Sequence, residues 1–310
     1  MTTADSWILA RRLGGLRRFA AAITILNLLG HTIFGFEQAW IQPVVSVVTA
    51  YLCELFIEWT DARAEGRALH FLGGWRQFVD FLLPAHITGL AVAMLLYPGS
   101  SLLPIVFASA VAIASKATFR FGVQGRKRHF LNPSNFGITL TLLLFPWVSI
   151  APPYHFTENL SSAGSLILPG IICVSGTFIN WRFTGRLPLI VSWWAGFVTQ
   201  ALLRAALLGT PLGGSLNPMT GVAFILFSYY MISDPATTPF DRRSQVAFGF
   251  SVAAVYGLLV SMHIAFDLFF ALTAVTGARG LAHYARSFRR GTSLAAVPTP
   301  REAAVINKTA

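Results

Sequence analysis

Residues 78–118 read FVDFLLPAHITGLAVAMLLY, PGS and SLLPIVFASAVAIASKAT. The stretch holds two apolar runs, 78–97 and 101–118, separated by a short segment of turn-forming residues. Asp80 and Lys116 are its only charged residues, and both lie near its ends. An α-helix needs about 20 apolar residues to cross the hydrocarbon core of a bilayer. The stretch therefore predicts two transmembrane helices joined by a tight turn.

The same pattern continues along the chain. Apolar residues make up 55% of the 310 positions and charged residues only 11%, which leaves too little polar surface for a water-soluble fold of this length. The mean hydropathy is +0.62. Ten apolar runs are predicted to span the membrane, at 19–36, 39–57, 78–97, 101–118, 134–151, 165–180, 188–208, 218–232, 244–262 and 264–279.

Basic residues lie on one side of this predicted topology. With the N-terminus in the cytoplasm, 22 of the 23 Lys and Arg residues fall in cytoplasmic segments, and only Arg204 lies within a span. Positively charged loops face the cytoplasm in membrane proteins. The net charge of +11 therefore reflects topology, and nucleic acid is excluded as a partner. The expected location is the inner (plasma) membrane, with both termini in the cytoplasm.

The predicted fold is an all-α integral membrane protein of about ten transmembrane helices, in contact with the lipid bilayer. A cytoplasmic segment, 1–18, includes a short interfacial helix over 5–18, and 19–280 form the membrane domain. Residues 281–310 are predicted to be a disordered cytoplasmic tail, because 291–310 are small, polar and proline-containing. Ten spans suggest two inverted five-helix repeats, and Thr88-Gly89 and Thr220-Gly221 form a weak echo between the halves.

One cytoplasmic loop contains more basic and amide side chains than the membrane topology requires. It runs from Gly125 through Arg126-Lys127-Arg128-His129 to Asn132-Pro133-Ser134-Asn135-Phe136-Gly137. Asn-Pro is a good helix start, because Asn caps free N–H groups and Pro at the first position loses no hydrogen bond. A helix N-terminus beside three cationic side chains also forms an anion site. Both interpretations, a capped helix start and an anion or cofactor site, remain open.

A second loop, Met231-Ile-Ser-Asp234-Pro235-Ala-Thr237-Thr238-Pro239-Phe-Asp241, follows the eighth span. Two prolines break the helix here, and irregular backbone near the hydrocarbon must be satisfied by protein or by a cavity. The loop is either a capped turn, with Asp241 capping the next helix, or a site where Asp234, Thr237 and Thr238 orient a polar ligand.

Few ionisable residues lie within the spans, and such residues are candidates for function. Arg204 and Asp267 each lie about one turn from the outer surface, which predicts an ion pair between the seventh and tenth helices. His31 and His86 differ in depth by roughly 8 Å, so a shared haem is disfavoured.

The two loops resemble those of the RnfD/NqrB family of membrane electron-transport subunits. Arg-His-Phe-Leu-Asn132-Pro133-Ser-Asn-Phe-Gly137 is similar to that family's Gly-Lys-x-Phe-x-Asn-Pro-Ala-x-x-Gly. Met231 to Pro239, followed by Gln245 to Gly249, resembles its Met-Ala-Thr-Asp-Pro-Val-Thr-Ser-Pro and Gly-Gln continuation. The resemblance covers about 19–280 and looks closest to the UnbU-type membrane proteins found with enediyne biosynthesis genes.

The resemblance implies electron transport through a flavin (FMN or riboflavin), with other redox subunits as partners and a possible role in secondary-metabolite biosynthesis. It also implies that six residues belong to cofactor-binding loops: Asn132, Pro133, Asn135, Asp234, Thr237 and Thr238. The family attaches FMN to the Thr of a Ser-Gly-Ala-Thr motif, and the nearest string here is Ser175-Gly176-Thr177. The expected flavin is therefore bound non-covalently.

Two other functions remain open. Inverted repeats with polar residues near the midplane are the usual plan of secondary transporters, so the chain could be a transporter or channel for a small solute. The chain could also be a membrane enzyme that acts on a hydrophobic metabolite, although no HExxH, GxSxG or histidine-box pattern supports a self-contained active site.

Overall fold

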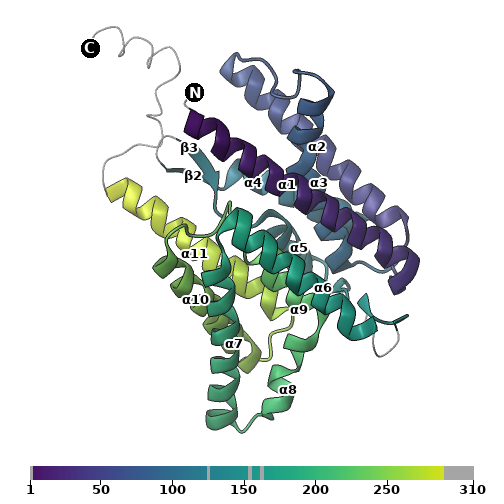
Figure 1. Cartoon of the computed structure of the whole chain (residues 1–310), viewed down its shortest axis with the longest axis vertical. Coiled ribbons are helices and arrows are strands. Elements are labelled where there is room, and N and C mark those ends of the chain that lie inside the picture. The colour runs from purple at the N-terminus through teal and green to yellow at the C-terminus, as the bar shows by residue number, and fades with distance from the viewer. Residues whose placement is uncertain (1–2, 124–125, 153–155, 161–163, 290–310) are drawn as a thin grey trace.

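The computed structural model describes residues 3–123, 126–152, 156–160 and 164–289. Helices dominate this part of the chain (Figure 1). The helices of the first half are α1 (Thr3–Leu29), its π-helical extension η1 (Gly30–Phe34), α2 (Ile41–Glu65), α3 (Trp75–Leu95), α4 (Leu103–Thr118) and α5 (Pro133–Leu144).

The second half is also mainly helical. Its elements are α6 (Gly164–Ile179), η3 (Asn180–Thr184), α7 (Leu187–Leu208), α8 (Leu212–Leu216), η4 (Asn217–Thr220), α9 (Val222–Leu226), η5 (Phe227–Met231), α10 (Arg242–Ser261) and α11 (Asp267–Arg289). Two short antiparallel pairs accompany the helices: β1 (Leu96–Tyr97) with β4 (Ser149–Ile150), and β2 (Arg120–Val123) with β3 (Arg126–His129).

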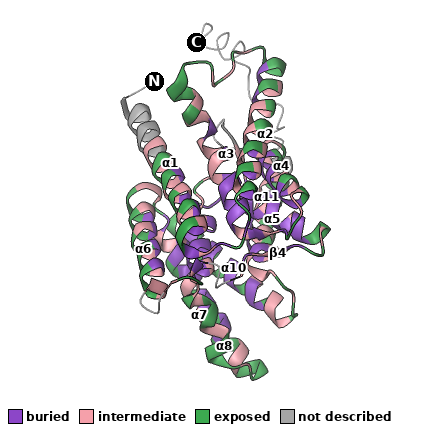
Figure 2. Cartoon of the chain, turned by 90° about the vertical axis from the view of Figure 1, so that its right-hand side faces the viewer, coloured by how far each residue is buried: buried purple, intermediate pink, exposed green. Residues whose placement is uncertain are grey.

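The chain is a multi-pass α-helical membrane protein. Six helices are long and apolar enough to cross a bilayer: Leu13–Phe34, Ile41–Glu65, Trp75–Leu95, Gly164–Thr184, Leu187–Leu208 and Arg242–Ser261. Large apolar side chains such as Leu52, Val174 and Leu207 are exposed on their outer faces, as lipid contact requires (Figure 2). Three further apolar helices are shorter, at Leu103–Thr118, Pro133–Leu144 and Val222–Met231.

Each of the ten predicted ranges contains a helix, but several boundaries were wrong. The helix predicted for 134–151 ends at Leu144, because Pro146 cannot continue it. The range 218–232 is a succession of short 3₁₀, α and π turns.

The termini of the membrane domain also differ from prediction. Residues 3–29 form one continuous helix, so no separate interfacial helix lies over 5–18. Helix α11 continues to Arg289, and the predicted tail 281–310 is therefore helical over its first nine residues. Residues 290–310 lie outside the described part of the chain.

Helices α1 and α6 end in the same way. Each passes into one π-helical turn that is closed by a left-handed glycine, Gly35 (φ 83°) or Gly185 (φ 67°). The glycine N–H donates to the first carbonyl of the π turn, Gly30 in one half and Asn180 in the other. Only glycine adopts this backbone conformation without a steric cost. The π turn η3, which follows α6, packs on α1, where Phe183 lies against Gly15 (Figure 1).

Close helix contacts hold the core and position the loops. At Gly137 of α5 an added Cβ would lie 2.3 Å from the Ala108 carbonyl oxygen of α4, so only glycine permits this approach. In the second half, Trp193 of α7 is fully buried and donates from its indole N–H to Ser228 Oγ at 2.9 Å. These contacts fix the N-terminus of α5 and the end of η5, where the two loops singled out in the sequence begin.

Candidate functional site

The two predicted loops meet in space, although about 100 residues separate them. Asn132 donates from its side-chain amide to the Met231 carbonyl oxygen at 3.0 Å. Arg128 donates to the carbonyl oxygens of Pro235 and Ala236, at 2.8 and 3.0 Å. We call this region the two-loop site: residues 128–135 and 231–241, together with Arg186 and Arg279.

Asn132 also caps α5, as the sequence predicted. Its Oδ1 accepts from the backbone N–H of Asn135 at 3.0 Å and from the Ser134 hydroxyl at 3.1 Å. Pro133 is buried at the first helical position, where its missing N–H costs nothing. The side chain of Asn132 therefore performs the capping role and joins the two loops.

Asn135 ties α5 to α11. Its amide donates to the Phe269 carbonyl at 3.0 Å and to the Thr273 hydroxyl at 2.7 Å. Its Oδ1 is buried and has no hydrogen-bond partner. Gln245 of α10 presents a second such acceptor, since its Oε1 is buried and unpartnered. Buried polar atoms are nearly always satisfied, and these two acceptors are among nine buried side-chain atoms without a hydrogen-bond partner in the described part of the chain.

The loop after η5 is organised by its own side chains. Asp234 accepts from the backbone N–H of Ala236 at 3.0 Å and from the Thr237 hydroxyl at 3.1 Å. The Thr238 hydroxyl donates to the Asp234 carbonyl at 2.6 Å. Asp241 caps α10 through the backbone N–H of Ser244, as the capped-turn interpretation predicted. A ligand role for Asp234, Thr237 and Thr238 stays a prediction; the structure gives them the role of fixing the loop.

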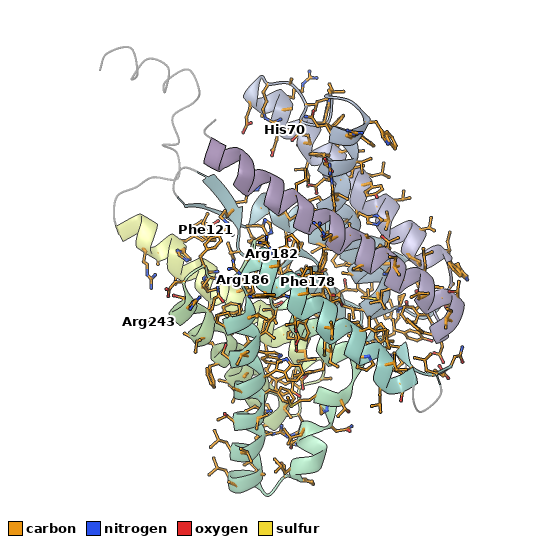
Figure 3. The ribbon with its side chains drawn as sticks, in the orientation of Figure 1. His70, Phe121, Phe178, Arg182, Arg186 and Arg243 are labelled. Carbon is orange, nitrogen blue, oxygen red and sulfur yellow. The ribbon has the colours of Figure 1, made fainter. Side chains whose placement is uncertain are left out.

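Two arginines that the sequence did not single out complete the site. Arg186, between η3 and α7, is 2% exposed and donates from Nε to Thr238 Oγ1 at 2.8 Å and from Nη2 to the Pro235 carbonyl at 3.3 Å (Figure 3). Arg279 of α11 donates to the Thr237 carbonyl. The sequence alone predicts both arginines only as cytoplasmic charges. Their hydrogen-bond partners lie about 50 and 40 positions away along the chain, so no local pattern reveals them.

The site carries an excess of buried positive charge. Among the residues that the structure describes, no carboxylate lies within 4.0 Å of Arg186 or Arg279. The pKa of Arg186 is lowered to about 10, mainly by burial; Asp234 opposes this shift, and the neighbouring charges of Arg128 and Arg279 add to it. Outside the site, Lys116 is paired with Glu54 at 2.6 Å. A buried cation whose only nearby carboxylate lies beyond ion-pair distance is costly, so the site fits an anion.

His129 and Phe240 complete the surroundings. Burial lowers the pKa of His129, and Asp234 opposes that shift, so the imidazole is neutral near pH 7 and adds no charge. The ring of Phe240 lies 4.5 Å from the Arg128 guanidinium and 4.9 Å from that of Arg186, and its side chain is exposed. The site thus combines cationic donors, orphaned acceptors and an exposed aromatic face.

The predicted ion pair between Arg204 and Asp267 is absent. Arg204 donates to Gln200 Oε1 at 3.4 Å, and Asp267 accepts from the Leu268 backbone N–H at 2.8 Å. The pairing fails because Asp267 is the first residue of α11 and its carboxylate is used at that helix start. The two Thr-Gly pairs have different surroundings, since Gly89 is buried against α2 whereas Gly221 begins α9, and the inverted repeat stays a prediction.

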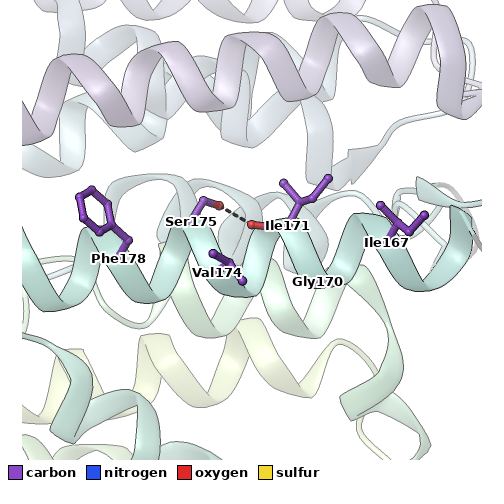
Figure 4. Close-up of a pocket in the computed structure, with 6 residues that line it drawn as sticks. All are labelled: Ile167, Gly170, Ile171, Val174, Ser175 and Phe178. Atoms are coloured by element: carbon purple, nitrogen blue, oxygen red, sulfur yellow. Dashed lines mark hydrogen bonds between the residues drawn. The ribbon is translucent and has the colours of Figure 1, made fainter.

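Ser175-Gly176-Thr177 lies on α6, beside an apolar groove of about 630 Å³. The groove is lined by Ile167, Gly170, Ile171, Val174, Ser175 and Phe178 (Figure 4). Thr177 donates to the Tyr229 hydroxyl, and Ser175 donates to the Ile171 carbonyl at 2.7 Å. None of the arginines or loop residues of the two-loop site lines this groove, so the groove is separate from that site.

No protein-family model matches the chain, and no curated protein matches it in sequence.

Proposed function

We propose that the chain is a ten-span membrane subunit that transfers electrons through a flavin, FMN or riboflavin, bound non-covalently at the two-loop site. The observation that carries the proposal is the pair of buried Arg186 and half-buried Arg279, for which the described residues offer no carboxylate within 4.0 Å. FMN offers the missing counter-ion in its phosphate, which arginine binds strongly. Its ring N–H group would satisfy an orphaned acceptor.

The residues present fit such a group. Arg186 and Arg279 would bind the phosphate, while the one ring N–H of oxidised flavin would donate to either Asn135 Oδ1 or Gln245 Oε1. The exposed face of Phe240 offers a surface for an aromatic ring. Bound flavin supplies the redox chemistry, and the protein supplies binding, orientation and electrostatics. Asn132 and Asp234 would act as positioning residues, because they hold the two loops together.

The proposal requires partners. The sequence contains no nicotinamide fingerprint and no iron–sulfur motif, so electrons must arrive from and leave to other redox proteins. Both termini and the two-loop site would face the cytoplasm, where soluble or membrane-bound donors could reach the flavin. The resemblance of the loops to the RnfD/NqrB family, and to its UnbU-type members in secondary-metabolite biosynthesis, agrees with this arrangement.

The first test is the absorbance spectrum of the detergent-purified protein, repeated on the supernatant after acid precipitation. We expect the bands of oxidised flavin in the protein and their release into the supernatant, because no covalent bond holds the cofactor. Protein that is colourless and fails to bind either added FMN or added riboflavin would overturn the proposal.

The arginines are tested by titrating FMN and riboflavin into flavin-free protein and following flavin fluorescence. Arg279→Gln removes a charged donor, and a hydrogen bond to a charged group contributes about 1.5–3 kcal/mol, so FMN affinity should fall about tenfold or more. Riboflavin has no phosphate, and its affinity should be unchanged. Arg243→Gln is the matched control, because Arg243 is exposed at the start of α10 (Figure 3). An equal loss of affinity for FMN and for riboflavin would show that Arg279 does not bind the phosphate.

A second candidate function rests on the same buried charge. If the counter-ion of Arg186 and Arg279 is a solute rather than a cofactor, the chain is a secondary transporter or channel for a small anion. The two candidates separate experimentally. Anion flux into proteoliposomes that is lost in Arg279→Gln, together with absence of bound flavin, supports transport.

A further inference from the structure

The apolar groove on α6 continues along the helix into η3. Ile167, Ile171, Val174 and Phe178 follow each other at spacings of four, three and four residues, so they share one side of α6 (Figure 4). A second hollow, of about 340 Å³, is lined again by Val174 and Phe178 and reaches Trp181 in η3. We call the two hollows together the α6 groove.

The walls of the α6 groove suit an apolar occupant. No atom lies within 4 Å of a Cβ added at Gly170, so the space above this part of the helix is open. The Ser175 hydroxyl donates to the Ile171 carbonyl oxygen at 2.7 Å, and the Thr177 hydroxyl donates to that of Tyr229 at 3.1 Å. The hydroxyl groups of the groove therefore already donate to protein partners.

The length of the α6 groove matches the depth of a lipid chain. From Ile167 to Trp181 the helix rises about 21 Å, at about 1.5 Å per residue. One leaflet of the hydrocarbon core is about 15 Å thick, half of the whole core. Trp181 is 68% exposed, and exposed tryptophans gather at the boundary between hydrocarbon and headgroups. The groove thus runs from the headgroup level through the depth of the adjoining leaflet.

Cationic side chains stand at one end of the α6 groove. Phe178 contacts Phe183, with ring centroids 6.0 Å apart, and the Arg18 guanidinium of α1 lies 4.8 Å from the Phe183 ring. Arg182, in the same π turn as Phe183, is exposed (Figure 3). The first turns of α6, residues 164–171, contain no charged residue. The groove is therefore apolar along its length and positively charged at its η3 end.

Arg18 can bind a further group. Its Nη1 donates to the Gly14 carbonyl oxygen at 3.0 Å, and the other guanidinium N–H groups make no hydrogen bond within the described part of the chain. Its neighbour Arg17 is by contrast paired with Asp80 at 2.6 Å. No described carboxylate lies within 4.0 Å of Arg18. A guanidinium held against an aromatic ring, with donors still open, is preorganised for a phosphate.

We propose that the α6 groove binds an anionic phospholipid, with one acyl chain along the apolar face and the phosphate at Arg18 and Arg182. A phospholipid combines an apolar chain of leaflet depth with a phosphate at the headgroup level, which are the two features that the groove presents. Interfaces between membrane helices are enriched in small residues, whereas Ile, Val and Phe dominate this face, which favours lipid over a second copy of the chain.

The charge of the headgroup follows from the two arginines. A zwitterionic headgroup brings a cation of its own next to them, whereas an anionic headgroup does not, so a lipid with net negative charge is preferred. The two-loop site contributes no residue to the groove, and the inference therefore goes beyond the proposed function.

The experiment is native mass spectrometry of the full chain in detergent, after removal of co-purified lipid. Dioleoyl phosphatidylglycerol and dioleoyl phosphatidylcholine are added in turn, so that only the headgroup differs. We expect phosphatidylglycerol to bind at least about fivefold more tightly, because each arginine near a lipid surface favours an anionic headgroup by about this factor. Equal affinities for the two lipids would overturn the inference.

Two arginine variants test the headgroup end of the groove. Arg18→Gln should lower the affinity for phosphatidylglycerol about fivefold more than the affinity for phosphatidylcholine. Arg243→Gln is the matched control, since Arg243 is exposed at the start of α10 and should leave the preference unchanged. Arg18→Gln should also leave FMN affinity unchanged, which separates this inference from the flavin proposal. An unaltered lipid preference in Arg18→Gln would refute the assignment of the phosphate.

Gly170→Leu tests the apolar part of the groove. The added side chain enters open space and leucine is the better helix former, so the variant should fold and should bind both lipids several-fold more weakly. Gly213→Leu in α8 is the matched control, because a Cβ there also meets no atom within 4 Å. Undiminished lipid binding in Gly170→Leu would overturn the inference. So would a dimer that only Gly170→Leu abolishes, because a second copy would then occupy the groove.

Discussion

At the scale of single residues, Asn132 uses both atoms of its side-chain amide. Oδ1 caps α5 and Nδ2 bonds the Met231 carbonyl of the other loop. A lost cap costs about 1 kcal/mol and a lost buried hydrogen bond about 1 kcal/mol more. Asn132→Ala should therefore lower the free energy of unfolding by about 2 kcal/mol, measured by SDS titration from mild detergent with circular dichroism.

Asn132→Ser separates the two contributions. The serine hydroxyl can cap the helix but is too short to reach Met231, so this variant should lose only about half as much stability as Asn132→Ala. Equal destabilisation of both variants would show that the cap contributes nothing, and that Asn132 acts only as the bridge between the loops.

The contrast between Asn132 and Arg186 shows how much of the site the sequence could predict. Asn132-Pro133 is a local signal, because a cap bonds N–H groups two or three residues away, and the structure confirms it. Arg186 reaches Thr238 and Pro235 across about 50 residues, and no local pattern distinguishes it from an ordinary cytoplasmic arginine. The sequence could likewise place Arg204 and Asp267 at one depth, but the direction in which each side chain bonds depends on tertiary packing.

At the scale of helices, the contact between α4 and α5 depends on Gly137. A Cβ there would lie 2.3 Å from the Ala108 carbonyl oxygen and 2.9 Å from the Ala112 Cβ, so the helices would have to separate. Overpacking of this kind costs about 1–3 kcal/mol. Gly137→Ala should lower the free energy of unfolding by that amount in the same SDS titration. It should also weaken flavin binding, because α5 carries Asn132.

Gly170 on α6 is the matched control for this prediction. No atom lies within 4 Å of a Cβ added there, and alanine is the better helix former. Gly170→Ala should therefore be neutral or stabilising by up to about 1 kcal/mol. If both glycine variants behave alike, close packing at Gly137 does not hold α4 to α5.

Helix boundaries show the same division between local and long-range causes. Apolar composition predicted where helices lie, because the alternation of apolar runs and turn residues is a property of each segment. It overestimated α5, since the run stays apolar beyond Leu144 although Pro146 ends the helix. Apolar composition could not predict the π turns after α1 and α6, because one widened turn does not change the 3.6-residue pattern of apolar side chains enough to be recognised.

At the scale of the whole molecule, the number of crossings depends on the short helices. Val222–Met231 has ten residues and rises about 15 Å, half the thickness of the hydrocarbon core. The preceding helical turns, Leu212–Leu216 and Asn217–Thr220, extend the segment at its N-terminal end. If this segment crosses, Arg242 and Arg243 face the cytoplasm with the other basic loops, as the positive-inside rule requires.

Single-cysteine labelling decides this topology. In a variant with Cys53 and Cys173 replaced by alanine, a membrane-impermeant maleimide on intact cells should label Ser100→Cys and Ser215→Cys, which lie in the turns expected outside. Arg243→Cys should react only after the membrane is permeabilised. Labelling of Arg243→Cys from outside would mean that Leu212–Met231 re-enters without crossing. The two-loop site would then be divided between the two sides of the membrane, which the bond from Asn132 to Met231 forbids, so that result would contradict the fold as well as the ten-span topology.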